Sequence, residues 1–190
     1  MSIEKKYLVW GSDPGKKGAL VQLDTRPLVP EIVAQFKFPL VGRCYDPHAL
    51  FDLLSTRLEN TASFTLEEVH AIHGTNAKST FEFGGTLFAL RTAAAFLHIP
   101  CHMVQPKAWQ AVAWAGVPRV TVSVPTKAGK TGKPVPARMK VDPKATSLMA
   151  ARAIWPSHDF RRTEKCARMD EGIIDAALIG YYGVMRLRGN

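Results

Sequence analysis

Acidic side chains occur at positions where a carboxylate would be held with little freedom. Asp13 follows the apolar run 7–10 and precedes the tight turn at Pro14-Gly15. The neighbours Glu67 and Glu68 fall in a second apolar run, and strand alternation would turn them to opposite faces. Asp175 lies in an apolar segment near the C-terminus. Because a buried carboxylate is costly unless it is paired or bound to a metal ion, these acids indicate a partly buried acidic site.

Glu171 is a further candidate, because it precedes Asp175 by one helical turn and shares a helix face with it. Like charges at this spacing repel, and a cation between them would remove the penalty. A structural explanation competes with this one, since acids in the first turn of a helix interact favourably with the helix dipole. That explanation fits Asp170 and Glu171 well and fits Asp175 poorly.

Three or four carboxylates from separate elements suit Mg²⁺, a hard cation that takes oxygen ligands and keeps several waters. Two such ions can activate a water molecule and stabilise the leaving oxygen in phosphodiester hydrolysis. We therefore expect a site for two Mg²⁺ ions, with Mn²⁺ able to substitute.

The positive charge of the chain is concentrated in one part of it. The formal net charge is +9, and residues 119–168 hold 12 Lys and Arg against 3 Asp and Glu. The rest of the chain is neutral, so this segment favours a phosphate-binding face, with a solvated basic loop as the alternative. The candidate DNA contacts are Lys107, Lys127, Lys130, Lys133, Arg138, Lys140 and Lys144.

The composition argues against several classes of protein. Apolar residues make up 46% of the 190 residues, enough for the core of one domain, and no apolar run is long enough to span a membrane. Cys44, Cys101 and Cys166 lie far apart, which argues against a disulfide framework and against a Cys-based zinc site. The N-terminus lacks signal and transit patterns, so we expect a cytoplasmic protein with no membrane partner.

The hydrophobic pattern predicts the elements that position these residues. Strands are expected at 7–10, 18–23, 32–38, 63–69 and 101–104, the first three joined as antiparallel hairpins. Helices are expected at about 46–58, 79–98, 108–115, 142–155 and 170–186, two of them starting with Asp-Pro. This order predicts one α/β domain, 1–190, with a mixed sheet and helices on both faces. Residues 116–142 form a Pro-, Gly- and Lys-rich insertion, expected to be a mobile loop or an irregular hairpin.

At these positions the sequence resembles the RuvC-type Holliday junction resolvases. Gly11-Ser12-Asp13-Pro14-Gly15 resembles their first motif, and Leu66-Glu67-Glu68-Val69 is similar to their second. Phe83-Gly84-Gly85 and Pro106-Lys107-Ala108-Trp109 resemble the phage and chloroplast branch. The stretch 170–183 resembles their last motif closely, and the matches occur in order over about 10–20, 64–109 and 145–183.

The resemblance implies a ribonuclease H-like fold whose five-stranded mixed sheet has three antiparallel strands followed by parallel ones. It implies a homodimer that makes paired nicks across a four-way DNA junction, with no nucleotide cofactor. Asp13, Glu67 and Asp175 would be catalytic metal ligands, and Glu67 is preferred to Glu68, whose position often holds Gln. Glu171 would be the fourth catalytic acid and metal ligand, at a position where relatives carry Asp or His.

Other functions and roles stay open. A protein that binds branched DNA without cutting it also fits the basic segment. The sequence barely distinguishes a junction resolvase from a related nuclease that acts on flaps or RNA–DNA hybrids. A sugar-kinase or actin-like ATPase shares the first motif, but the chain is too short for two such domains. We expect Phe81, Phe83 and Phe88 in the core or at a dimer interface, and Trp109, Trp114 and Trp155 in the core. The residues His70, His73 and Asn76 are expected to form a polar loop that could also touch DNA.

Overall fold

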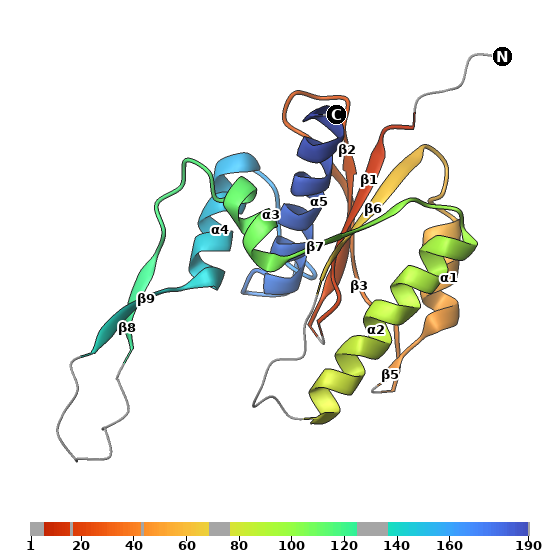
Figure 1. Cartoon of the computed structure of the whole chain (residues 1–190), viewed down its shortest axis with the longest axis horizontal. Helices are drawn as coiled ribbons and strands as arrows, with labels where there is room; N and C mark the ends of the chain where they lie inside the picture. The colour runs from red at the N-terminus through yellow and green to blue at the C-terminus, as the bar shows by residue number, and fades with distance from the viewer. Residues whose placement is uncertain (1–5, 16, 43, 69–76, 125–136, 190) are drawn as a thin grey trace.

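A computed structural model describes residues 6–15, 17–42, 44–68, 77–124 and 137–189 of the chain (Figure 1). At its centre is a five-stranded sheet with the strand order β3-β2-β1-β6-β7. Its strands are β1 (Leu8–Asp13), β2 (Ala19–Asp24), β3 (Glu31–Lys37), β6 (Thr61–Glu67) and β7 (Cys101–Val104). The pairs β1–β2 and β2–β3 are antiparallel, and the pairs β1–β6 and β6–β7 are parallel. The predicted mixed sheet is therefore confirmed.

Helices cover both faces of this sheet, as predicted (Figure 1). One face carries α5 (Glu171–Gly189) together with α3 (Pro106–Ala113) and α4 (Pro143–Ile154), and the other carries α1 (Pro47–Ser55) and α2 (Ala77–Phe96). Successive strand residues point to opposite faces, so Val9 joins the core cluster under α5 and Trp10 joins the cluster under α1 and α2.

The helix α5 crosses the central strand at very short range. A Cβ atom on Gly11 of β1 would lie 2.2 Å from the carbonyl oxygen of Ala176, so only glycine fits at this crossing. Asp13 lies two residues after Gly11 and therefore points to the same face of β1. Asp175 directly precedes Ala176 in α5. The close crossing thus brings the end of β1 and the first turns of α5 together.

The helices α1 and α4 begin where the Asp-Pro signals predicted them. Asp46 accepts hydrogen bonds from the backbone N–H groups of His48 and Ala49, both at 3.0 Å. Asp142 caps α4 in the same way. In the part of the chain that the structure describes, no helix is long and apolar enough to cross a membrane.

Two small hairpins form separate two-stranded sheets outside the central sheet. The pair β4 (Leu40–Val41) and β5 (Cys44–Tyr45) was not predicted from the sequence. The pair β8 (Thr121–Val124) and β9 (Arg138–Val141) forms an antiparallel ribbon that projects beside α4 in Figure 1. Its base is joined to α4, because the Val120 N–H donates to Thr146 Oγ1 at 3.1 Å.

Some predicted residues lie outside the described part of the chain. These are Lys127, Lys130 and Lys133 of the predicted insertion and His70, His73 and Asn76 of the predicted polar loop.

The large aromatic side chains divide into two groups. Trp109, Trp114 and Trp155 are buried, as predicted. Phe81 and Phe88 on α2 are 83% and 72% exposed, so they are not part of the core of this chain. Their assignment to a dimer interface stays a prediction.

Candidate active site

Three of the predicted acids lie at one edge of the sheet. Asp13 and Glu67 are the last residues of β1 and β6, which run parallel side by side, so both strands end at the same edge. Asp175 lies in the second turn of α5, whose first turns pack over the end of β1. The charges interact, since Asp13 raises the pKa of Glu67 and of Asp175, and Glu67 also raises the pKa of Asp175.

Asp13 is fixed by the turn that follows it. The backbone N–H of Gly15 donates to Asp13 Oδ1 at 2.9 Å, in the turn predicted from Pro14-Gly15. Burial raises the pKa of Asp13 above its ordinary value, and the Gly15 N–H and the charge of Lys37 act in the opposite direction. Asp13 Oδ2 accepts no hydrogen bond from any described residue, so this oxygen can bind a cation.

Glu67 is held by a tryptophan from the neighbouring helix. Trp109 of α3 donates its indole N–H to Glu67 Oε1 at 2.8 Å. Burial raises the pKa of Glu67 to about 7, although this hydrogen bond lowers it. Trp109 was assigned only to the core from the sequence. The signal that could have shown its second role is its place just after β7, the strand beside β6.

Asp175 is the third partly buried acid of the site. Burial and the charge of Asp13 raise its pKa to about 7, and a hydrogen bond with Ser147 of α4 acts in the opposite direction. Ser147 is itself buried. Sequence reasoning missed Ser147, because a single serine inside a helix carries no pattern that points to a partner in another helix.

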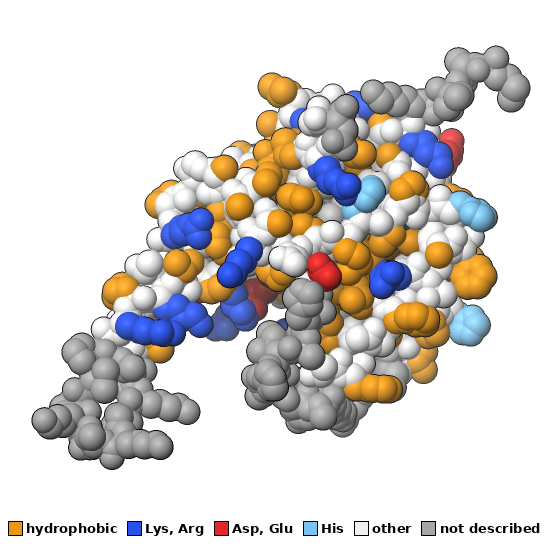
Figure 2. Space-filling view, viewed as in Figure 1, with side chains coloured by type: hydrophobic (Ala, Val, Ile, Leu, Met, Phe, Trp, Pro, Cys, Tyr) orange, Lys and Arg blue, Asp and Glu red, His pale blue; other side chains and the backbone are white. Residues whose placement is uncertain are grey.

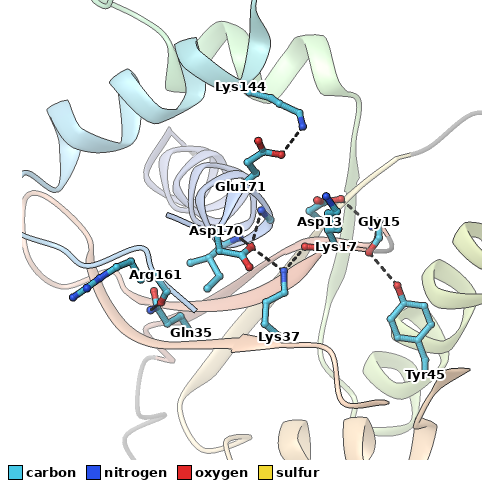
Figure 3. Close-up of polar contacts among 12 residues, drawn as sticks. Asp13, Gly15, Lys17, Gln35, Lys37, Tyr45, Lys144, Arg161, Asp170 and Glu171 are labelled. Carbon is cyan, nitrogen blue, oxygen red and sulfur yellow. Dashed lines mark hydrogen bonds and ion pairs between the residues drawn. The ribbon is translucent and has the colours of Figure 1, made fainter. Parts of the chain in front are cut away.

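Glu171 and Asp170, drawn in Figure 3, differ from these three acids because each has a lysine partner. The Glu171 side chain is 51% exposed, and its Oε2 lies 2.5 Å from Lys144 Nζ. Asp170 caps α5 by accepting from the N–H of Gly172 at 3.0 Å, and it forms an ion pair with Lys37 at 2.8 Å. Asp170 therefore has the structural role expected at a helix start. The cation expected beside Glu171 is the ammonium group of Lys144.

The donor set fits a divalent cation chemically. Among the described residues, no three His, Cys, Asp or Glu side chains converge closely enough to hold a metal ion as they stand. However, Asp13, Glu67 and Asp175 are gathered hard oxygen donors, and none of them forms an ion pair with a described residue. Buried like charges raise one another's pKa, and a divalent cation among them removes both the repulsion and the need for a proton.

The described candidate DNA contacts are exposed on the surface of the molecule. Lys107 is exposed in the first turn of α3, two residues before Trp109. Arg138 and Lys140 are exposed on β9 and alternate to the same face of the ribbon. Figure 2 shows Lys and Arg side chains gathered along the side of the molecule that carries α4 and the ribbon.

No family model and no curated protein matches this chain, but several solved structures do. Thermus thermophilus RuvC in complex with a Holliday junction substrate has a TM-score of 0.62 at 16% identity, over 96% of both chains. A second structure of Thermus thermophilus RuvC has a TM-score of 0.56 at 15% identity, also over 96% of both. The yeast mitochondrial Holliday junction resolvase Ydc2 has a TM-score of 0.52 at 14% identity, over 95% of this chain and 78% of Ydc2. This chain therefore has the ribonuclease H-like fold of the RuvC-type Holliday junction resolvases, as its motifs predicted.

Proposed function

We propose that this protein is an endonuclease that resolves four-way DNA junctions by metal-dependent hydrolysis of phosphodiester bonds. The observation that carries the proposal is that Asp13, Glu67 and Asp175, three partly buried acids without a cationic partner among the described residues, lie at one edge of the sheet. Carboxylates that lie together without a cationic partner favour the binding of a divalent cation. The adjoining basic segment favours a polyanion, and the solved structures with this fold are Holliday junction resolvases.

Hydrogen bonds within the chain orient the acids so that they could bind a cation. Asp13 and Glu67 would hold Mg²⁺ through the oxygen that the Gly15 N–H and the Trp109 indole leave free. Asp175 would join them, oriented by Ser147, and Glu171 would become a ligand after leaving Lys144. Bound Mg²⁺ supplies an activated water and neutralises charge on the phosphate. Because protons and cations compete for the same oxygens, the raised pKa values of Glu67 and Asp175 make binding weaker below about pH 7.

The exposed cations around the site would bind the DNA backbone. Lys107 lies in α3, two residues before the Trp109 that binds Glu67, so it would contact a phosphate close to the cut. Arg138 and Lys140 would contact phosphates farther from the cut, because they lie on the ribbon that projects from α4. Lys144 would release Glu171 when a phosphate takes its ammonium group. The further predicted contacts are Lys127, Lys130 and Lys133.

The proposed assembly is a homodimer formed through α2. Phe81, Phe88 and Phe96 are 83%, 72% and 73% exposed, and their helical spacing places them on one face of α2. A row of large apolar side chains in water is typical of an interaction surface. A second copy covering this row would give two active sites, one for each of the paired nicks.

The dimer is tested by Phe88→Ser and analytical ultracentrifugation. The wild-type protein should sediment as a dimer and the variant as a monomer. Leu28→Ser is the matched control, since Leu28 is 91% exposed in the β2–β3 connection, away from α2. A wild-type protein that stays monomeric at micromolar concentration, or a dimeric Phe88→Ser variant, would contradict this assembly.

The activity is tested with labelled four-way junctions, flaps, linear duplexes and RNA–DNA hybrids in Mg²⁺ or Mn²⁺. The proposal predicts symmetric nicks in the four-way junction and no cleavage by Asp13→Asn, which keeps the shape of the side chain. Tight junction binding without nicking in any divalent cation would identify a binding protein instead. Faster cleavage of flaps or hybrids would identify the related nuclease.

A further inference from the structure

Two hollows flank the first turn of α5. The first has a volume of about 430 Å³, lies between α4, α5 and the segment before α5, and includes Asp175 in its wall. The second, also about 430 Å³, lies toward β3 and the β4–β5 hairpin. Arg168 and Glu171 line both hollows, so the two meet at the start of α5. Figure 3 shows this turn, with Lys144 on one side of it and Lys37 on the other.

The segment that separates α4 from α5 is strongly basic. Residues 161–168, here called the basic loop, have the sequence Arg-Arg-Thr-Glu-Lys-Cys-Ala-Arg. Its ends are joined by an isolated β-bridge between Arg161 and Met169. Gln35 of β3 donates to the carbonyl oxygen of Arg161 at 3.2 Å, which fixes the start of the loop against the sheet. The fold therefore determines where the loop presents Arg168.

The cations that line the first hollow differ in how they are neutralised. Lys144 pairs with Glu171, and Arg161 pairs with Asp159 at 2.8 Å. Arg152 and Arg168 are exposed and form no ion pair with any described residue. Arg152 lies in the last turn of α4, and its guanidinium is 3.8 Å from Met169 Sδ, at the end of the basic loop. The hollow that Asp175 lines is thus also lined by two arginines that no described acid neutralises.

The acidic site of such a nuclease has to bind a substrate that is itself negatively charged. The carboxylates that hold the cations repel the phosphates of the substrate, so attraction must come from cations beside the acids. Arginine suits this role, because its planar fork forms paired hydrogen bonds to phosphate oxygens. The helix dipole gives a structural reason for a positive charge at Arg152, because this residue lies in the last turn of α4. Arg168 lies outside the helices, so the dipole gives no such reason for its charge.

We propose that Arg152 and Arg168 together bind a backbone phosphate next to the scissile one, so that the cut strand runs through the first hollow past Asp175. This inference rests on the proposed function, because it takes DNA as the substrate. Both residues act as positioning residues. They hold the strand in register with the acids and take no part in the bond cleavage itself.

The first measurement is the salt dependence of junction binding, made with Asp13→Asn protein without divalent cations. Each neutralised phosphate contributes roughly 0.9 to the slope of log K against log salt. The combined Arg152→Gln and Arg168→Gln changes should reduce the slope by about 1 and weaken binding about tenfold. The control is Lys165→Gln, which removes one positive charge from the basic loop, as Arg168→Gln does, although Lys165 lines neither hollow. Thermal melting confirms that each variant is folded.

The second measurement locates the phosphate. Junctions that carry one uncharged methylphosphonate at successive positions around the cut should bind wild-type protein less well at one flanking position. The double variant should be insensitive there and as sensitive as wild type elsewhere. With Mg²⁺ and unmodified DNA, the double variant should show a raised KM and an unchanged kcat.

The outcomes separate this inference from the proposed function. A double variant whose slope matches that of Lys165→Gln, or whose loss is the same at every methylphosphonate position, would overturn the inference while junction cleavage by wild type stands. If wild type binds junctions without cutting them and the double variant still loses one position-specific contact, the inference holds and the nuclease assignment fails.

Discussion

The substitution Asp175→Asn tests whether the acids of the site destabilise the fold that holds them. Without a bound cation, burial and the charge of Asp13 raise the pKa of Asp175 from 3.8 to about 7. A raised acid pKa means that the folded protein binds this proton more tightly than the unfolded chain does. The folded state is therefore not penalised below about pH 4, and it loses stability as the pH rises from there to about 7.

The size of this effect follows from the pKa difference. The difference is about 3, at 1.36 kcal/mol each, so ionised Asp175 costs roughly 4 kcal/mol above pH 7. Asparagine is neutral and nearly the same shape, and its amide can still bond to Ser147. A buried amide needs hydrogen-bond partners for all its polar atoms, and any atom without one reduces the gain in stability. We expect Asp175→Asn to raise the free energy of unfolding by roughly 2 kcal/mol near pH 8, and to give no gain near pH 4.

The assay is urea unfolding in EDTA near pH 8 and near pH 4, followed by the same measurement in saturating Mg²⁺. Mg²⁺ should stabilise the wild-type protein near pH 8 and leave Asp175→Asn almost unchanged. The matched control is Asp159→Asn, because the hydrogen bond from Arg161 lowers the pKa of Asp159 to about 2 and its replacement should destabilise instead. A wild-type protein in EDTA that is as stable as Asp175→Asn near pH 8 would refute the reasoning.

Three further substitutions test other parts of the structure. Trp109→Phe removes the N–H that lowers the pKa of Glu67, so the midpoint of a cleavage pH profile should rise by about 0.5 to 1. Gly11→Ala places a Cβ atom 2.2 Å from the Ala176 carbonyl oxygen, so urea unfolding should show a loss of about 3 kcal/mol or more. Asp46→Ala removes the N-cap of α1 and should cost about 1 kcal/mol in the same assay, with cleavage by the folded protein unchanged.

Each of these has a result that contradicts it. An unmoved cleavage midpoint in Trp109→Phe would show that the indole does not act on Glu67. Wild-type stability in Gly11→Ala would show that α5 does not press on β1, and Gly189→Ala serves as its control because no atom lies within 4 Å of that added Cβ. Slower cleavage by folded Asp46→Ala would mean that α1 contributes to the site.

The sequence predicted the elements with the strongest periodicity and lost accuracy where tertiary contacts decide. The apolar run 7–10 marks a strand, but β1 continues to Asp13 through Gly11 and Ser12, which are not large apolar residues. Gly11 is buried because α5 crosses it, and that helix lies far along the chain; Ser12 is buried on the opposite face of the strand. The β4–β5 hairpin was missed because two-residue strands are too short for any alternation to be read.

The residues of the candidate site also divide into those that the sequence predicted and those that only tertiary contacts identify. The three partly buried acids were found because each lies in or directly after an apolar stretch, where a charged side chain is unusual. Ser147 and Lys37 were missed because their partners, Asp175 and Asp170, lie on other elements. The charge count of residues 119–168 included Arg152 and Arg168 without distinguishing them. Only the fold shows which cations share a hollow with Asp175.

The pairing of charges around the site supports a cation-binding role over a structural one. Lysines neutralise the outer acids, Lys37 at Asp170 and Lys144 at Glu171, and Glu171 is half exposed. Asp13, Glu67 and Asp175 are less exposed than Glu171, and none of them has a lysine partner among the described residues. Stability alone would favour the reverse, because an unpaired carboxylate costs more in the interior than at the surface. An arrangement that leaves partly buried acids unpaired costs stability unless a cation binds there, and Asp175→Asn would measure that cost.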